Sequence, residues 1–120
     1  MNIEIKKQQG VTIVQIQGEI DLYNAPTLQK AIREKIDEGE KKILIDLQEC
    51  TYVDSSGLGC FISIMKRLAT VKGAIKVANA KENITNLFKV ARLTTMFGVY
   101  PSVDEAIAVL SEGEETLSKR

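Results

Sequence analysis

The sequence contains no histidine. This absence removes the most common general base near neutral pH, the base of Ser-His-Asp and Cys-His nucleophiles, and the most common metal ligand. Cysteine is also scarce: Cys50 and Cys60 have neither a C-x-x-C spacing nor a second pair, which argues against a zinc site or a disulfide framework. We interpret both as small, partly buried apolar residues. Most hydrolase classes are therefore excluded.

An excess of charge of one sign is missing as well. Sixteen basic side chains balance sixteen acidic ones, and the basic residues are scattered from Lys6 to Arg120 without forming a stripe. The sequence therefore lacks the electrostatic signature of a nucleic-acid binder, and a protein partner is favoured. No apolar segment approaches the roughly 18 residues of a membrane span, and the first residues do not begin a signal peptide. We expect a cytoplasmic protein with no direct contact to nucleic acid or membrane.

The chain of 120 residues is long enough for one domain with its own core. Apolar alternation and short apolar runs predict strands at residues 2–6, 11–17, 43–47, 74–78 and 97–100, with a break after the second strand at residues 18–21. Apolar spacings of three and four residues predict helices over residues 25–37, after residue 55, after residue 80 and after residue 102. We expect a single α/β domain over residues 1–111, with a mixed sheet of about four to five strands and about four α-helices. Residues 112–120 are charged and are expected to fray.

The segment Asp54-Ser55-Ser56-Gly57-Leu58-Gly59 joins the apolar run at residues 43–47 to an amphipathic helix. A serine here lies at a helix N-terminus, where backbone N–H groups lack partners and the helix dipole is positive. Ser56 is therefore expected to cap the helix, and a phosphate on its hydroxyl would be tolerated there.

The helix that follows is expected to present two different faces at 100° per residue. One arc should face the core and contains Leu58, Phe61, Ile62, Met65, Leu68 and Ala69. A second stripe is too polar for a core and too apolar for plain solvent. It contains Ser56, Cys60, Ser63 and Arg67, flanked by Ile64 and Val71. The stripe is either a docking surface or a half-exposed flank without a partner.

The predicted order of strands and helices, together with three sequence blocks, resembles the STAS domain. More narrowly, it resembles a bacterial anti-sigma factor antagonist. The resemblance covers about residues 2–110. The matching blocks are Gly18-Glu19-Ile20-Asp21 with Ala25-Pro26-Thr27-Leu28, Ile45-Asp46-Leu47 through Val53-Asp54-Ser55-Ser56-Gly57-Leu58-Gly59, and Phe97 with Ser102-Val103-Asp104-Glu105-Ala106.

The resemblance implies a substrate of a kinase, not a catalyst. In that family the unphosphorylated antagonist binds an anti-sigma factor that is also a serine kinase, and so frees a sigma factor. The kinase, which holds the ATP and magnesium, phosphorylates the residue that corresponds to Ser56, and a serine phosphatase reverses the reaction. The resemblance implies that this chain carries no cofactor or metal of its own. We expect the chain to be a monomer when it is free.

The predicted partner-binding face combines the serine loop, the turn after the second strand and the stripe of the helix. Its residues are Asp21, Asn24, Asp54, Ser55, Gly57, Gly59, Cys60, Ser63, Ile64 and Arg67. Several of these roles stay open. Asp54 has two possible roles. In one it orients the kinase or the serine hydroxyl, and in the other it braces the loop by accepting from backbone N–H groups. Gly57 and Gly59 either allow close approach of a partner or form a tight turn. The Cys60 thiol is either exposed or part of the core.

Two other functions compete with this one. In the first, the chain is a STAS scaffold or an accessory subunit of a stress-sensing or lipid-transport complex, in which Ser56 is never modified. In the second, Ser56 is the nucleophile of a hydrolase, but the base is missing and Asp54 stands where a Gly-x-Ser-x-Gly elbow needs glycine. A phosphorylated-aspartate receiver fits the opening hairpin and the serine pair poorly.

Overall fold

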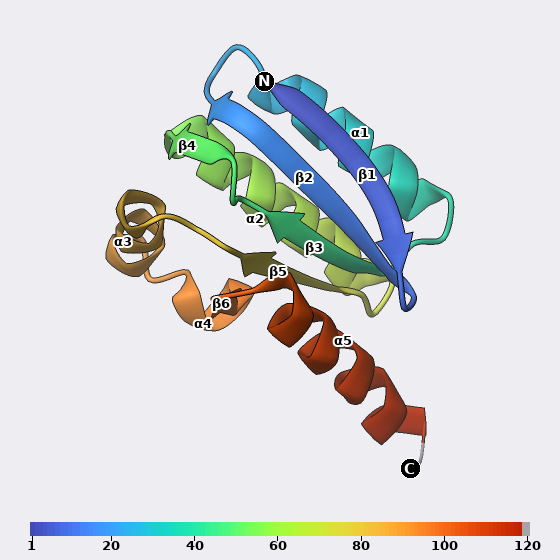
Figure 1. Ribbon diagram of the computed structural model, residues 1–120. Helices are drawn as coiled ribbons and strands as arrows, with labels where there is room; N and C mark the ends of the chain where they lie inside the picture. Colours follow the sequence, from blue (N-terminus) through green and yellow to red (C-terminus); the bar gives the residue numbers. More distant parts are fainter. Residues whose placement is uncertain (119–120) are drawn as a thin grey trace.

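A single mixed sheet of six strands organises the protein (Figure 1). The structure is a computed structural model that describes residues 1–118, and side chains through residue 111. The elements are β1 (Asn2–Gln8), β2 (Val11–Ile20), α1 (Ala25–Asp37), β3 (Lys42–Asp46), β4 (Cys50–Val53), α2 (Ser55–Thr70), β5 (Ala74–Ala78), α3 (Glu82–Val90), α4 (Thr94–Phe97), β6 (Val99–Tyr100) and α5 (Val103–Ser118).

The strand order is β1-β2-β3-β5-β6, and β4 also pairs with β2. The opening hairpin is antiparallel, as predicted, and every other pair is parallel. Parallel strands need helical crossovers, which explains the alternation of strands and helices after β2. The predicted α/β fold with a mixed sheet is confirmed.

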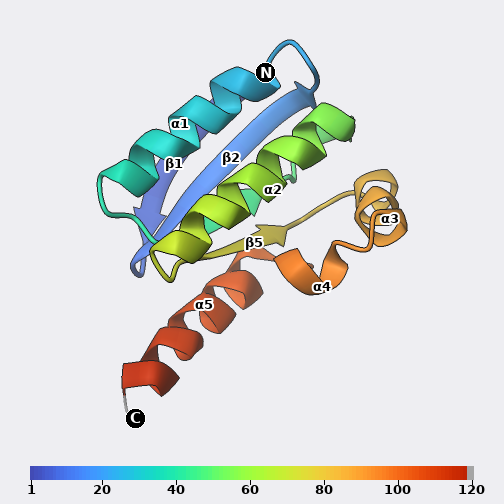
Figure 2. The same cartoon turned by 180° about the vertical axis from the view of Figure 1, so that it is seen from behind.

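Helices cover the two faces of the sheet unequally. Helices α1 and α2 lie side by side across one face (Figure 2), where their apolar side chains pack on β2, β3 and β5. Phe61 of α2, Phe88 of α3 and Phe97 of α4 form an aromatic cluster at one side of this layer, with ring centroids 5.6–6.4 Å apart. Helix α5 packs on the opposite face through Ala106, Ile107 and Leu110. Because β3 lies between both layers, Ile43, Leu44 and Ile45 are all fully buried, as its continuous apolar run predicted.

The second strand does not end at Gly18, where the sequence pattern predicted a break. Gly18 adopts a φ of +100°, which glycine reaches without steric cost, and the pairing shifts between Gly18 and Glu19. Past this irregularity β2 pairs with β4, a strand that the sequence analysis did not predict. Ile20 and Val53 are register partners, so the turn before α1 and the serine loop before α2 leave the sheet side by side.

The expected fraying of residues 112–120 stays a prediction. The backbone of α5 is described to Ser118, the side chains from residue 112 onward lie outside the description, and so do residues 119–120 altogether.

Candidate phosphorylation and partner-binding site

Asp54, and not Ser56, caps helix α2. Its Oδ1 accepts hydrogen bonds from the backbone N–H groups of Ser56 (2.9 Å) and Gly57 (3.1 Å). The expectation that Ser56 is the cap is therefore wrong: Ser56 lies inside the first turn, where the Asp54 side chain already accepts from two of the free N–H groups. Of the two roles left open for Asp54, the structure shows bracing of the loop.

The two serine hydroxyls of the loop remain unbonded. Ser55 is exposed and Ser56 half-buried, and neither side chain makes a hydrogen bond within the described residues. Among the described side chains, Ser111 Oγ is the buried polar atom that lacks a hydrogen-bond partner. Because Ser56 Oγ also lacks a partner but is not buried in this sense, it is in contact with solvent. Modifying Ser56 would break no hydrogen bond of the described structure.

The turn between β2 and α1 is locked by its own polar side chains. Asp21 Oδ1 accepts from the N–H groups of Tyr23 (2.9 Å) and Asn24 (3.1 Å). Asn24 Oδ1 accepts from Asp21 N–H (2.9 Å), and its Nδ2 donates to the Glu19 carbonyl (2.8 Å). Asn24 thus occupies the cap position of α1 but makes no side-chain cap bond to that helix. Both residues instead hold the turn rigid.

Asp54 joins this turn to the serine loop. Its Oδ2 accepts from the N–H of Leu22 at 3.2 Å, and its own N–H donates to the Ile20 carbonyl at 3.1 Å. The sequence-predicted residues Asp21, Asn24, Asp54, Ser55 and Ser56 are therefore brought together at one end of the sheet. Their role in binding a partner stays a prediction.

Leu22 and Tyr23 also lie at this end, and the sequence analysis did not single them out. Their side chains are 64% and 90% exposed, respectively, on the rigid turn beside the serine loop. The sequence does contain a signal that could have identified them: two large apolar residues stand in a predicted turn, where polar residues are usual. Leu22 and Tyr23 therefore place exposed apolar surface beside the serine loop.

The two glycines of the loop differ in environment. A Cβ on Gly57 would lie 2.6 Å from Val53 Cγ1 and 2.9 Å from Ile20 Cγ2, so this buried glycine serves the packing of α2 on the sheet. The expected partner contact at Gly57 stays an untested prediction. Gly59 is exposed, and a Cβ there would meet nothing within 4 Å. Gly59 therefore leaves space beside the backbone, and its expected contact with a partner stays a prediction.

The predicted docking stripe of α2 mostly faces α1. Cys60 and Ile64 are only 3% and 2% exposed, so their side chains are part of the core, and their expected role in binding a partner stays an untested prediction. Burial raises the pKa of the Cys60 thiol to about 11, while the positive charge of Arg33 opposes the shift. The alternative of an exposed thiol is thereby excluded.

The polar residues of the stripe are also engaged by α1. Gln29 Nε2 donates to Ser63 Oγ at 2.8 Å, and the Arg67 guanidinium pairs with the Asp37 carboxylate. The stripe is polar because it forms the rim of a helix–helix contact. Binding of a partner by Ser63 or Arg67 stays untested.

The arc predicted to face the core is displaced for the same reason. Leu58, Phe61 and Leu68 are buried as expected, but Ile62 and Met65 are only partly buried, and Ala69 is exposed. Helix α2 contacts both the sheet and α1, so its buried face is rotated toward α1. Helical spacing alone does not reveal where a neighbouring helix lies.

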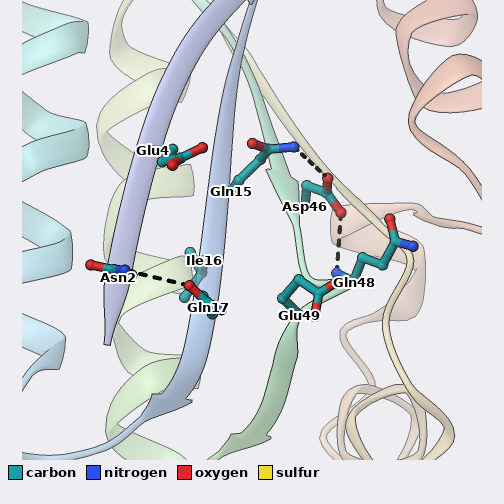
Figure 3. A pocket seen from close by; sticks show the side chains of 8 residues that line it. All are labelled: Asn2, Glu4, Gln15, Ile16, Gln17, Asp46, Gln48 and Glu49. Atoms are coloured by element: carbon teal, nitrogen blue, oxygen red, sulfur yellow. Dashed lines mark hydrogen bonds between the residues drawn. The ribbon is translucent and has the colours of Figure 1, made fainter.

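A polar hollow of about 210 Å³ lies on the face of the sheet opposite to α1 and α2 (Figure 3). Its most buried polar side chain, Asp46, accepts hydrogen bonds from Gln15 Nε2 (3.3 Å), the Gln48 N–H (3.1 Å) and Asn79 Nδ2 (3.0 Å). These bonds offset the cost of burying the carboxylate. The hollow is lined by Asn2, Glu4, Gln15, Ile16, Gln17, Asp46, Gln48 and Glu49.

No set of three or more His, Cys, Asp or Glu side chains in the described part of the chain is arranged to hold a metal ion. Within residues 1–118, no helix combines the length and the apolar composition that a membrane span requires.

The sequence of the chain is similar to those of known proteins. The STAS domain family matches residues 2–106. The anti-sigma-B factor antagonist of Bacillus subtilis strain 168 is 30% identical over 99 residues, which cover 82% of this chain and 90% of that protein.

Solved structures share the fold. The crystal structure of an anti-sigma factor antagonist from Mycobacterium paratuberculosis is 25% identical and superimposes with a TM-score of 0.83, over 91% of this chain and 92% of the other. The Bacillus cell fate determinant SpoIIAA in its phosphorylated form is 20% identical, with a TM-score of 0.72 over 89% of this chain and 97% of the other. Given the match over nearly its whole length and the similarity to the Bacillus subtilis protein, the chain belongs to the STAS domain family and, within it, to the anti-sigma factor antagonists.

Proposed function

We propose that this chain binds an anti-sigma factor that is also a serine kinase, that it thereby frees a sigma factor, and that phosphorylation of Ser56 ends the complex. The observation that carries the proposal is the unbonded Ser56 hydroxyl in the first turn of a helix whose cap is another residue. The kinase supplies ATP and magnesium, and a serine phosphatase restores the binding form. The chain itself catalyses nothing in this scheme and works in the cytoplasm as a monomer when free.

The proposed site tolerates the modification structurally. Since Asp54 holds the N–H groups of Ser56 and Gly57, a phosphate on Ser56 Oγ leaves the cap in place. The positive end of the α2 dipole also favours a negative group at this position. SpoIIAA, which has this fold, exists in a phosphorylated form, so the fold accommodates such a group. The charge can therefore change while the backbone stays where it is.

The same charge would act against binding. Phosphorylation adds about −1.5 to −2 charges to a surface that loses its water when it meets a partner. The carboxylates of Asp54 and Asp21 lie on the same end of the sheet, and the proposed kinase already holds nucleotide phosphates. Like charges in an interface raise the free energy of the complex. A loss of about 3 kcal/mol already weakens binding more than a hundredfold.

Leu22 and Tyr23 would supply contacts to the partner that do not depend on whether Ser56 is phosphorylated. Their exposed side chains stand on a turn fixed by the side chains of Asp21, Asn24 and Asp54, so little conformational entropy is lost when they are buried. In this proposal the apolar turn provides affinity and the serine provides control.

The test uses the pair Ser55→Ala and Ser56→Ala. Each purified variant is incubated with Mg-ATP and the anti-sigma factor kinase of the same cell, and its intact mass is measured. We expect one added phosphoryl group on the parent chain and on Ser55→Ala, and none on Ser56→Ala. Binding of Ser56→Asp to the kinase should be at least about a hundredfold weaker than binding of Ser56→Ala.

Addition of phosphate to Ser56→Ala, or its absence from the parent chain, would reject Ser56 as the acceptor. Loss of the phosphate in Ser55→Ala alone would assign the switch to the more exposed neighbour. Equal binding by Ser56→Asp and Ser56→Ala would favour the unmodified STAS scaffold.

A further inference from the structure

The contact between α1 and α2 contains a groove of about 170 Å³ that is separate from the serine loop. Two polar links cross between the helices along it: the Gln29–Ser63 hydrogen bond and the Asp37–Arg67 ion pair. The groove is lined by Gln29, Arg33, Ile36, Ser63, Ile64 and Arg67. Space of roughly 10–15 Å³ already admits one water molecule, so this groove admits a larger solute.

The polar lining of the groove is rich in hydrogen-bond donors. Arg33 makes no hydrogen bond or ion pair within the described residues, so all the N–H donors of its guanidinium are available to a ligand. Arg67 binds Asp37 through Nη2 and retains further N–H groups. Ser63 Oγ accepts from Gln29, which leaves its hydrogen free to donate. The lining contains no carboxylate, since Asp37 lies outside it and is paired with Arg67.

We propose that this groove binds a phosphate group, either free or as an ester on a small molecule. Guanidinium groups form charge-assisted, paired hydrogen bonds with phosphate oxygens, and here one guanidinium comes from each helix, with a hydroxyl on the α2 side. A tetrahedral phosphate has oxygens to meet donors from both walls, whereas a carboxylate has only two. Because the two cross-links hold the walls in place, binding requires little reorganisation.

This site is independent of the proposed phosphorylation. Ser56 and Ser63 are seven residues apart on α2, which is about 10 Å along the helix axis. A phosphate in the groove therefore does not stand in for a phosphate on Ser56, and the inference holds whether or not Ser56 is modified.

The test is an NMR titration of the full ¹⁵N-labelled chain, in its Ser56→Ala form, at low ionic strength. The ligands are inorganic phosphate and glycerol phosphate, with sodium chloride and sodium acetate at matched ionic strength as references. We expect saturable shifts of the backbone amides from Gln29 to Ile36 and from Ser63 to Arg67. If the ester binds more tightly than inorganic phosphate, the natural ligand is a phosphate ester; the reverse order indicates free phosphate.

Two substitutions on α1 provide matched variants, because each removes one positive charge from an exposed position. Arg33→Gln should weaken phosphate binding at least about tenfold, since it removes a charge-assisted pair of hydrogen bonds. Lys30→Gln, outside the groove, should change it less than about twofold. Since Arg33 has no partner in the described structure, its replacement should leave the fold intact, which the spectrum of the free variant checks.

Shifts that do not saturate, or that chloride or acetate reproduces, would overturn the proposal. Equal weakening of phosphate binding by Arg33→Gln and Lys30→Gln would also overturn the proposal. Such a result would mean that phosphate is attracted only by the net positive charge of the surface.

Discussion

Helix α2 is held at its two ends by different kinds of contact. At the N-terminal end, backbone groups are fixed by the Asp54 carboxylate, and Gly57 packs against Ile20 and Val53. Further along, the side chains of Ser63 and Arg67 bind partners on α1. The first end leaves its serine side chains unbonded, whereas the second end uses its polar side chains for internal contacts.

This difference separates two tasks along one helix. A residue can be modified without loss of structure only where the backbone is held by something else, and that condition is met in the first turn of α2. The side chains of the following turns pack against α1 and the sheet. Three substitution experiments measure how well this separation holds.

The largest effect is expected for Gly57→Ala. The new Cβ would lie 2.6 Å and 2.9 Å from methyl groups of Val53 and Ile20, two stiff β-branched side chains of the sheet. Overpacking of this kind costs about 1–3 kcal/mol. The free energy of unfolding from urea titration should fall by that amount.

Gly59→Ala is the matched control on the same helix. Its Cβ would meet nothing within 4 Å, and alanine is the better helix former, so the stability should rise by about 0.5–1 kcal/mol. If both variants lose stability equally, α2 does not pack on the sheet through Gly57 as described.

A smaller effect is expected for Asp54, whose two carboxylate oxygens have separate tasks. Asp54→Ala removes the cap and the bond to the Leu22 N–H together and should cost about 1–2 kcal/mol. Asp54→Asn keeps an oxygen for the cap, because asparagine caps helices as well as aspartate does, but turns an amide donor toward Leu22.

The asparagine variant should therefore lose less stability than the alanine variant, while the amide resonances of Leu22 and Tyr23 shift in both. An asparagine variant as unstable as the alanine variant would mean that the link to the turn, and not the cap, holds this end of the helix.

The same division along α2 explains what the sequence could predict. The hairpin, the buried strand β3 and the position of the loop before α2 depend on local patterns: alternation, a continuous apolar run, and polar residues before an amphipathic segment. The cap itself was assigned to Ser56 instead of Asp54, because either residue type caps helices well. Strand β4 escaped prediction because its four residues pair only with the far end of β2, beyond the irregularity at Gly18. The burial of Cys60 and Ile64 escaped because it depends on where α1 lies, which no local pattern of α2 contains.

The smallest effect on stability, but the sharpest test of the α1–α2 contact, concerns the Cys60 thiol. Its pKa lies near 11, above its ordinary value of 9.0, because burial disfavours the thiolate. In a Cys50→Ala background at pH 8, a thiol reagent should leave the native protein almost unlabelled and label the urea-unfolded protein quickly, since only the thiolate reacts.

The raised pKa also fixes the direction of the pH dependence. A thiol whose pKa is higher in the folded state contributes stability below about pH 9, and this contribution is lost as the pH rises toward 11. Replacing Cys60 by alanine in the same background should flatten that part of the stability profile. Rapid labelling of the folded protein at pH 8 would place the thiol at the surface; α1 would then not cover the middle of α2, and the stripe from Cys60 to Arg67 would again be available to a partner.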